Sequence, residues 1–252
     1  MLTEKRQRVI EKYLDEHDLC QVIELCHLTQ TSESTIRRDL IQLEKAGVLT
    51  RVHGGARSIR DFSRDVSQHV RFGRNHQAKI AIARYAAHKV QPGSYIFIDA
   101  GTTTYEMVPF LAQIRDLTIV TNGLETALCA LGHQIETILI GGRIKADTHA
   151  GVGTFALKQL ATMNFTASFI GANGLDVQGH LMTPEPEEAA IKAAEMAQAQ
   201  TTYILMDASK IGERHFVTFG QANQATIVTS QLSQAAKAAI PADIRLEEAI
   251  YS

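Results

Sequence analysis

The chain has 252 residues, more than the ~100 to 200 of a typical domain, so we expect two domains, one of them small. Its 45% hydrophobic content, 21% charged content and five prolines are typical of globular proteins and exclude the disordered, collagen-like and disulfide-scaffold classes. The formal net charge of −2 neither favours nor excludes a nucleic acid as the partner.

The sequence predicts a cytoplasmic protein with no membrane segment, no metal site and no cofactor. The longest stretch without Asp, Glu, Lys or Arg, residues 215–236, contains Gln, Thr, Asn and Ser, which make it too polar to span a membrane. Glu4, Lys5 and Arg6 stand where a signal peptide begins its apolar region. The three cysteines, at positions 20, 26 and 129, lack the paired spacing of a zinc site, so we interpret them as core residues.

Residues 1–57 carry the pattern of a winged helix-turn-helix domain. Apolar residues at helical spacing predict a first helix capped by Thr3 and a short second helix in which Ile23 faces inward. Ser32 is predicted to cap a third helix, which ends before Gly47. Alternating apolar and polar residues and a double glycine then predict a small hairpin, the wing.

The third predicted helix has one apolar face and one basic face. Ile36, Leu40 and Leu43 form a stripe, and Arg37 and Arg38 lie opposite it. Adjacent arginines alone are more typical of a solvated helix surface. A capped helix followed by an Arg-bearing hairpin, however, offers the hydroxyl and guanidinium groups that bind in a major groove. The sequence therefore predicts contacts with double-stranded DNA from Ser32, Ser34, Thr35, Arg37, Arg38, Arg51 and His53.

Residues 58–75 are polar and lack clean periodicity, so we expect them to be a linker to a second domain of residues 76–252. In that domain helical patterns alternate with short apolar runs, which is typical of an α/β fold with a parallel sheet. The expected strands are residues 95–98, 117–120, 135–140, 168–172 and 203–206, with later ones at 225–229 and 244–250.

Polar residues follow the expected strands at their carboxyl ends, where parallel sheets bind ligands. A glycine followed by three threonines at a helix start presents N–H and hydroxyl groups to a phosphate, and Lys210 adds a positive charge. Each residue alone has a structural alternative, as a helix cap, a turn residue or, for Lys210, a partner of Asp207. Because five such ends meet at one edge, we expect a shared site for a phosphorylated sugar. Its predicted residues are Asp99, Gly101, Thr102, Thr103, Thr104, Thr121, Asn122, Gly141, Gly142, Arg143, Asn173, Glu188 and Lys210.

Motifs in both domains carry a family resemblance. They are SESTIRRDL from Ser32, LEKAGVLTRVHGGA from Leu43, FIDAGTTT from Phe97, VTNG from Val120, LIGGRI from Leu139, FIGANG from Phe169 and LMDASKIG from Leu205. With them, nearly the whole chain resembles the DeoR family of bacterial transcriptional repressors. The resemblance implies a sensor domain that is similar in fold to ribose-5-phosphate isomerase and holds a phosphosugar in these loops. Gln30 and Thr31 depart from the family pattern, in which a glycine and an aliphatic residue are common.

Two shorter segments, MLTEKRQ at the start and TPEPEEAAIK from Thr183, look closest to the fructose-operon repressors of Gram-positive bacteria. This resemblance implies repression of a sugar-utilisation operon and release from the operator by fructose 1-phosphate. We also expect a symmetric homo-oligomer, a dimer or a tetramer, because helix-turn-helix proteins match paired half-sites.

Two other functions stay open at the level of the sequence. A phosphosugar isomerase or deaminase needs a carboxylate base near a cation, and Asp99, Glu188 and Lys210 are the candidates. The chain lacks the Asp-Gly-Ala-Asp-Glu turn of the isomerases, because the matching loop reads GANG from Gly171. A DNA-binding protein whose large domain only dimerises leaves the polar strand ends unexplained. We therefore expect a repressor and no enzyme.

Overall fold

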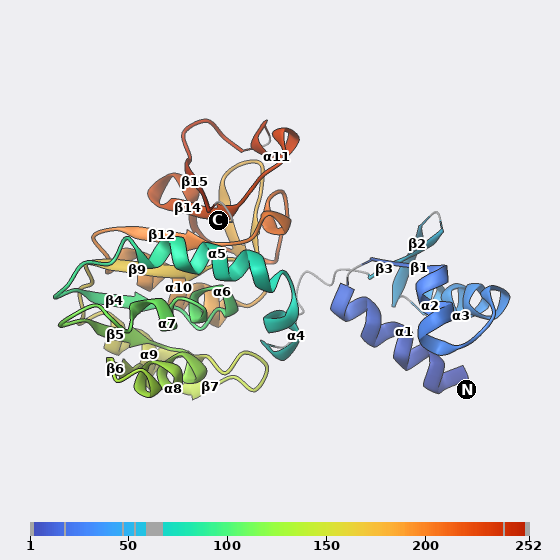
Figure 1. Ribbon diagram of the computed structural model, residues 1–252, viewed down its shortest axis with the longest axis horizontal. Helices are drawn as coiled ribbons and strands as arrows, with labels where there is room; N and C mark the ends of the chain where they lie inside the picture. The colour runs from blue at the N-terminus through green and yellow to red at the C-terminus, as the bar shows by residue number, and fades with distance from the viewer. Residues whose placement is uncertain are drawn as a thin grey trace. The chain divides into compact units, whose positions relative to one another are not determined.

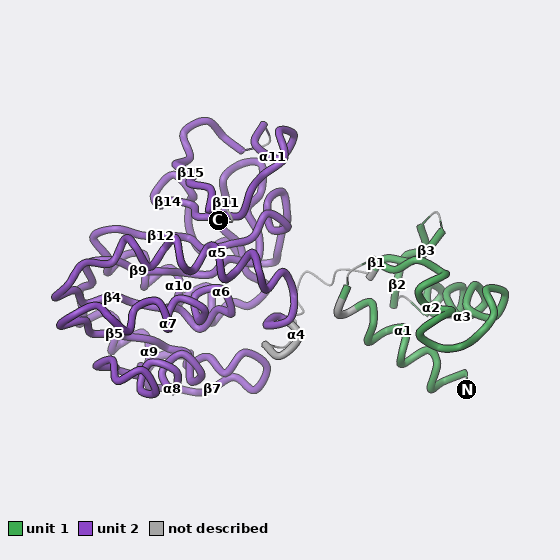
Figure 2. The backbone as a smooth tube through the Cα atoms, in the orientation of Figure 1, with its two compact units in different colours: residues 1–61 green, residues 62–252 purple. Residues whose placement is uncertain are grey.

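The computed structural model describes residues 3–17, 19–46, 48–52, 54–58, 68–238 and 240–249. The chain divides into two compact units, Met1–Asp61 and Phe62–Ser252 (Figure 2). Helix α4 (Gln68–Gly73) falls within the stretch expected to be a linker, so that stretch includes a helix of the second unit. Within the described ranges, no helix is both long enough and apolar enough to cross a membrane.

The first unit packs three helices beside a small antiparallel sheet with the strand order β1-β3-β2. Strands β2 and β3 confirm the predicted wing, whereas the sequence analysis missed β1, which has only three residues. The prediction that Ile23 faces inward is wrong, because Ile23 is 57% exposed; Val22 and Leu25 of the same helix lie in the core. The elements are α1 (Thr3–His17), β1 (Leu19–Gln21), α2 (Val22–Thr29), α3 (Glu33–Lys45), β2 (Leu49–Val52) and β3 (Gly55–Ser58).

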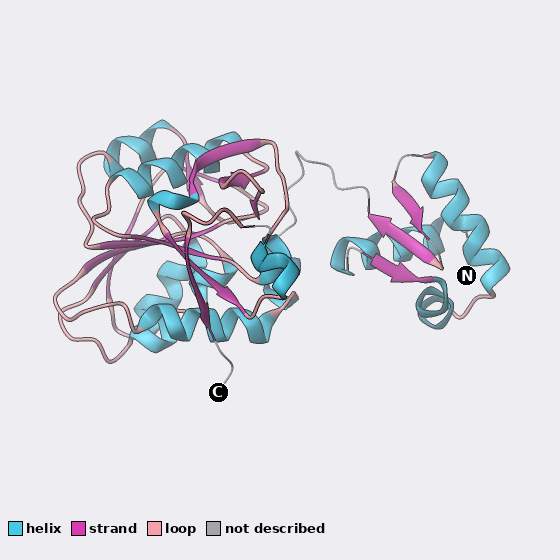
Figure 3. Ribbon diagram, turned by 90° about the horizontal axis from the view of Figure 1, so that it is seen from above, coloured by secondary structure: helices cyan, strands magenta, loops and turns pink. Residues whose placement is uncertain are grey.

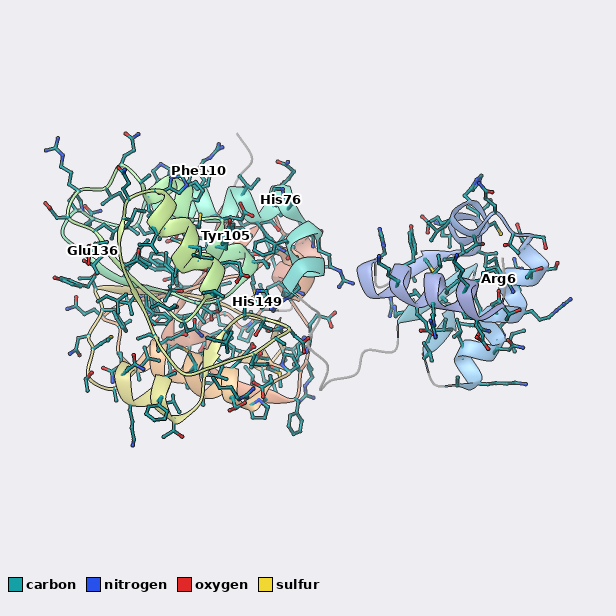
Figure 4. All side chains as sticks on the ribbon, turned by 90° about the horizontal axis from the view of Figure 1, so that it is seen from below. Arg6, His76, Tyr105, Phe110, Glu136 and His149 are labelled. Atoms are coloured by element: carbon teal, nitrogen blue, oxygen red, sulfur yellow. The ribbon has the colours of Figure 1, made fainter. Side chains whose placement is uncertain are left out.

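A buried ion pair joins α1 to α3. Arg6 Nε donates to Asp39 Oδ2 at 2.5 Å and Arg6 Nη2 donates to Asp39 Oδ1 at 3.0 Å, and both side chains are buried (Figure 4). Two parallel hydrogen bonds between planar groups fix orientation as well as distance. The pair therefore sets the angle at which α3 leaves the core of the first unit.

The second unit is an α/β domain (Figures 1 and 3). Its main elements are α5 (His76–Ala87), β4 (Tyr95–Ile98), α6 (Thr102–Tyr105), α7 (Val108–Leu111), β5 (Thr118–Thr121), α8 (Leu124–Gly132), β6 (Glu136–Leu139), α9 (Thr154–Leu160), β9 (Ala167–Gly171), α10 (Pro186–Ala197), β12 (Thr202–Leu205), β14 (Thr226–Ser230), α11 (Gln234–Ala238) and β15 (Arg245–Ala249). Its smaller elements are β7 (Arg143–Ile144), β8 (Gly151–Val152), β10 (Gly174–Leu175), β11 (His180–Thr183), β13 (Val217–Gln221) and the 3₁₀ helices η1 (Ala208–Lys210) and η2 (Ala222–Gln224).

Seven parallel strands form the main sheet in the order β15-β14-β12-β9-β4-β5-β6. All seven were predicted from apolar runs, and the parallel α/β fold is confirmed. The antiparallel pairs β7-β8 and β10-β11-β13 were missed. Strands β7, β8 and β10 have only two residues each, too few to show a periodicity in the sequence, whereas β11 and β13 have four and five.

Helices cover both faces of the sheet (Figure 3). Successive residues of β4 point to opposite faces: Ile96 and Ile98 pack with α5, α7 and α8, and Phe97 packs with α9 and α10. Both layers of the core are thus built on continuous apolar strands, as in sheets that are buried on both sides.

One helix, α10, buries charged side chains against the sheet. Glu188, Lys192 and Glu195 share its buried face at a spacing of one and two turns. Glu195 is fully buried, and neither of its carboxyl oxygens has a hydrogen-bond partner among the described residues. Burial, together with the negative charge of Asp99, raises the pKa of Glu195 well above 4.5. The folded chain therefore binds this proton more tightly than the unfolded chain does.

Replacement of Gln30 by glycine tests the turn between α2 and α3. Gln30 has φ 50° and ψ 47°, a left-handed conformation that costs an L-residue about 1 to 2 kcal/mol, while glycine adds about 0.5 to 1 kcal/mol of unfolded-state entropy. We expect Gln30→Gly to stabilise the first unit by up to about 1 kcal/mol, measured by calorimetry. The control Gln42→Gly, inside α3, should lose about 1 kcal/mol. Equal losses in both variants would contradict the left-handed turn.

Replacement of Glu195 by glutamine tests the buried proton. A carboxylic acid whose pKa is raised in the folded state contributes its full amount to the free energy of unfolding below pH 4.5. This contribution is lost as the pH rises above that value. The wild-type free energy of unfolding should therefore fall relative to Glu195→Gln, by at most about 1.4 kcal/mol per pH unit. Urea denaturation from pH 4 to 9 measures the difference. The control Glu187→Gln, at a half-buried position of the same helix, should follow the wild-type curve. A Glu195→Gln curve parallel to the wild type would show that the pKa of Glu195 is not raised.

Candidate functional site

The carboxyl ends of five neighbouring strands meet at one edge of the sheet. In the order β12-β9-β4-β5-β6 the strands are parallel and in register, so the loops that follow them lie side by side. The predicted effector residues follow the strand ends, except for Thr121, the last residue of β5, and Glu188, which lies in the first turn of α10. The topology thus brings the predicted residues to one region, and their contacts decide what each can do.

Lys192 bonds the ends of β4 and β9 together. Its Nζ donates to Asp99 Oδ2 and, at 3.0 Å, to the carbonyl oxygen of Gly171. The N–H group of Gly171 donates to the same Asp99 oxygen at 3.0 Å. Although burial opposes its charge, Asp99 and Glu195 raise the pKa of Lys192 above its ordinary value. The predicted residue Asp99 therefore serves the scaffold, and Lys192, which the sequence analysis missed, holds it.

The hydroxyl groups of the threonine loop after β4 have two different roles. Thr104 Oγ1 donates to the carbonyl oxygens of Asp99 and Gly101 at 2.7 and 2.8 Å, so this side chain closes the loop. Thr102 Oγ1 instead accepts a hydrogen bond from Lys79 Nζ at 2.9 Å. The first N–H groups of α6 have no acceptor inside a helix. A negatively charged oxygen fits here beside the ammonium group of Lys79.

Lys79 is the buried cation of this region. Its side chain enters from α5, is 5% exposed and also donates to the backbone carbonyl of Arg71 in α4. Burial, against the opposing charge of Asp207 and with the nearby charge of Lys210, lowers the pKa of Lys79 to about 8. The sequence analysis missed Lys79. The sequence feature that could have revealed it is a lysine on the face of α5 that is otherwise made of apolar and small residues, such as Ala78 and Ile82.

Thr121 and Asn122 tie the loops after β4 and β5 to each other. Asn122 Oδ1 accepts the N–H group of Ala100 at 3.0 Å, and Thr121 Oγ1 accepts that of Gly123 at 3.0 Å. A Cβ at Gly123 stands 2.9 Å from the Cα of Ala100, so only glycine allows this approach. Both predicted residues are buried and act on the shape of the site.

The start of α10 holds the β7–β8 hairpin through charged groups. Glu188 Oε1 accepts from Lys145 Nζ at 2.9 Å and from Thr148 Oγ1 at 2.7 Å. Burial opposes the ionised form of Glu188, but the charges of Lys192 and Lys145 lower its pKa below the ordinary value. Lys145 is a third cation that the sequence analysis missed. Its signal is a lysine two residues after the predicted Arg143.

Arg143 lies farther out than its predicted role requires. Its side chain is 60% exposed and pairs with Glu187. Gly141 and Gly142, which precede it, are exposed as well. Gly142 has φ 152°, and a Cβ there stands 2.6 Å from the carbonyl oxygen of Val152, so the hairpin packs this closely only with glycine.

Asn173 and Lys210 complete the edge from β9 and β12. Asn173 Oδ1 accepts from Thr183 Oγ1 at 3.2 Å, which orients the amide within its hairpin. Asp207 Oδ1 accepts from Asn75 Nδ2 and from the N–H group of Ser209, both at 3.0 Å, at the start of η1. Lys210 is the last residue of that short helix and lies near enough for its charge to lower the pKa of Lys79. The two ammonium groups thus come from sequence positions 131 apart to one region.

Helix α3 presents the predicted DNA-binding side chains on its outer face. Ser34, Arg37 and Arg38 are exposed, while Ile36 and Leu40 are buried. Arg37 pairs with Glu33 at 3.2 Å, whereas Arg38 makes no ion pair among the described residues.

The remaining predicted residues of the first unit differ in what they contact. Ser32 occupies the N-cap position, but its hydroxyl group bonds those of Ser34 and Thr35, at 3.1 Å each, instead of a backbone N–H. The side chain of Arg51 approaches Glu44 at 3.7 Å. His53 and Gly47 lie outside the described residues.

Family models match both units of the chain. The model of the DeoR-like helix-turn-helix domain matches residues 6–62. The model of the DeoR C-terminal sensor domain matches residues 74–231.

Similar proteins match along almost the full length of the chain. An uncharacterized HTH-type transcriptional regulator, FruR, of Bacillus subtilis is 38% identical over 93% of each chain. A lactose phosphotransferase system repressor of Streptococcus mutans is 34% identical over 90% of this chain and 91% of its own. Among solved structures, a D-ribose-5-phosphate isomerase in complex with phospho-erythronic acid matches 54% of this chain and 53% of its own, with 18% identity and a TM-score of 0.41. The family models and the two regulators place the chain in the DeoR family of transcriptional regulators.

Proposed function

We propose that this protein is a transcriptional repressor of a sugar-utilisation operon that leaves its operator when a phosphorylated sugar binds at the strand ends of the second unit. The observation that carries the proposal is the buried ammonium group of Lys79, 2.9 Å from the Thr102 hydroxyl at the first turn of α6. A bound phosphate offsets the free-energy cost of burying a cation, and the N–H groups of that turn donate hydrogen bonds to the phosphate.

The operator is read by α3. Its exposed serine and arginine side chains match the donors and acceptors of a major groove, and the buried Arg6–Asp39 pair fixes the helix that carries them. Arg38 is exposed and makes no ion pair among the described residues, so it offers the guanidinium fork that bidentate contact with a guanine requires. Arg51 and His53 are proposed to contribute to DNA binding as well. A homo-oligomer in the cytoplasm, a dimer or a tetramer, matches the paired half-sites of an operator.

The effector site is the edge formed by the five strand ends. Gly101, Thr102 and Thr103 hold the phosphate with Lys79 and Lys210, while the remaining predicted residues shape or close the site. Lys79 also donates to the carbonyl of Arg71, so a ligand that draws this ammonium group acts on α4. Helix α4 follows residues 59–67, which connect the two units in sequence.

Fructose 1-phosphate is the proposed effector. The fructose-type motifs of the sequence and 38% identity to FruR support this choice. A relative named as a lactose phosphotransferase system repressor supports the broader class of sugars that are phosphorylated on uptake.

Titration of sugar phosphates against a protein–operator complex tests the function. The operator is selected from random DNA, and binding is followed by fluorescence anisotropy. Each tenfold loss of DNA affinity requires about 1.4 kcal/mol of preference of the ligand for the released state. We expect release by fructose 1-phosphate, and a thermal shift equivalent to about 2.7 kcal/mol at 100 times its dissociation constant. Specific DNA binding that no sugar phosphate changes would refute the sensing step.

Lys210→Ala supplies the matched variant for this experiment. It removes a cation from the proposed site, so operator affinity should stay unchanged while release needs at least tenfold more effector. Lys158→Ala, an exposed lysine on α9, should behave as the wild type. An unaltered response in Lys210→Ala would remove that residue from the site.

Arg38→Ala tests the reading of the operator. Loss of a base contact should cost about 1 to 3 kcal/mol of binding free energy and relax the preference at one base pair. Loss of a phosphate contact should weaken all sequences alike and reduce the salt slope by about one unit. Arg38→Lys separates the two, because lysine keeps the charge but not the bidentate fork. Unchanged affinity in both variants would place Arg38 outside the interface.

A further inference from the structure

Lys79 is a buried cation that bonds only neutral oxygen atoms among the described residues. Its Nζ donates to the carbonyl oxygen of Arg71 and to Thr102 Oγ1, and within the described ranges it forms no ion pair. An ammonium group has three N–H donors, so one of them remains for a ligand. Because a buried charge without a counter-ion is unfavourable, the surroundings of Lys79 are suited to an anion.

Two further cations lie close enough to Lys79 for their charges to act on it. Burial, with the nearby charges of Lys210 and Arg71, holds the pKa of Lys79 at about 8. Asp207 and Glu106 act against this shift, but neither bonds the Lys79 ammonium group in the described part of the chain. Three positive charges repel one another in this region, and a phosphate between them offsets the repulsion.

The side chain of Arg71 lies at the strand-end edge of the sheet. It is half-buried, and its charge acts on Glu188 as well as on Lys79. Burial opposes the ionised form of Glu188, whereas two neighbouring lysines and Arg71 lower its pKa. Lys79 comes from α5 and Glu188 from α10, and these helices cover opposite faces of the sheet. A charge that acts on both therefore lies beside the carboxyl ends of the strands.

Helix α4, which carries Arg71, runs beside α6 (Figure 1). Through Lys79, the carbonyl group of Arg71 is joined to Thr102, the first residue of α6. The ring of Phe72 meets the edge of the ring of Tyr105, the last residue of α6, with the centroids 5.0 Å apart. The six-residue helix α4 is thus tied to both ends of the threonine segment.

We propose that the guanidinium group of Arg71 is a third cation for the phosphate of the effector, beside Lys79 and Lys210, so that the bound ligand holds α4 against α6. The inference rests on the proposed function and adds to it one binding residue and the direction in which α4 responds. A guanidinium group binds two phosphate oxygens through parallel hydrogen bonds, which fixes the orientation of the helix that carries it. Since residues 59–67 join α4 to the first unit in sequence, the phosphate acts on the part of the second unit nearest to that connection.

Calorimetric titration of the full chain with fructose 1-phosphate, and with inorganic phosphate as a probe without a sugar, tests the binding residue. We expect Arg71→Gln to weaken the binding of both at least tenfold and to leave operator affinity without effector unchanged. Arg71→Lys should recover part of the loss, because lysine keeps the charge but not the planar fork. Arg115→Gln, at an exposed position before β5 and so at the other end of the sheet, should bind as the wild type. Thermal melts show whether each variant folds.

A tryptophan on α4 tests the direction of its response. The chain has no tryptophan, so Phe72→Trp introduces a single fluorophore beside Tyr105. We expect saturating fructose 1-phosphate to reduce the quenching of this fluorophore by acrylamide at least twofold, because a held helix excludes the quencher. The ligand should have no such effect when Arg71→Gln is added. Tyr95→Trp, at the exposed amino end of β4, should be quenched equally with and without ligand.

The outcomes separate this inference from the proposed function. Wild-type ligand affinity in Arg71→Gln, or quenching at Phe72→Trp that stays constant or rises on binding, would overturn the role of Arg71 and α4. If the same sugar phosphate still releases the wild type from its operator, the proposed function stands without this residue. A wild type that binds neither fructose 1-phosphate nor inorganic phosphate would overturn the inference at its base, the cation site itself.

Discussion

The buried ammonium group of Lys192 holds the ends of the sheet's two central strands at a fixed separation. It bonds both Asp99, at the end of β4, and the carbonyl of Gly171, at the end of β9. Removing one partner from a buried pair leaves an uncompensated charge that costs several kcal/mol, so α10 stays against these strands. This contact therefore sets the positions of the loops that follow the two strands, including the threonine loop after β4. Burial, together with the negative charge of Asp99, raises the pKa of Glu195, deeper on the same helix, well above its ordinary value.

The fold was predictable because its strands are continuous apolar runs bounded by glycine and polar residues. Such runs are typical of parallel strands buried on both faces, and all seven main strands match the structure to within a residue or two. The short hairpins were not predictable, since their geometry is set by contacts such as the close approach of Gly142 to Val152. Ile23 failed because α2 is short and begins with two neighbouring apolar residues, of which Val22 faces the core and Ile23 does not.

The region of the site was predictable, but the roles within it were not. Strand order alone brings the five loops together, whereas the use of each hydroxyl or amide depends on its neighbours in space. The side chains of Thr104 and Asn122 form hydrogen bonds with the backbone of the loops themselves. The cations Lys79, Lys145 and Lys192 come from other segments of the chain and were missed, because their burial arises only when those segments pack against the strand ends.

Strand β6 links the proposed effector site to the surface of the second unit. Its end leads into Gly141 and Gly142, and its middle carries the partly exposed Ile138 and Leu139. The amide of Gln159 bonds Gly141, and Gln159 lies one turn from the exposed Phe155, so the same contact joins the glycine loop to the outer side of α9. A sugar phosphate that binds as proposed and shifts the glycine loop therefore acts on both β6 and α9.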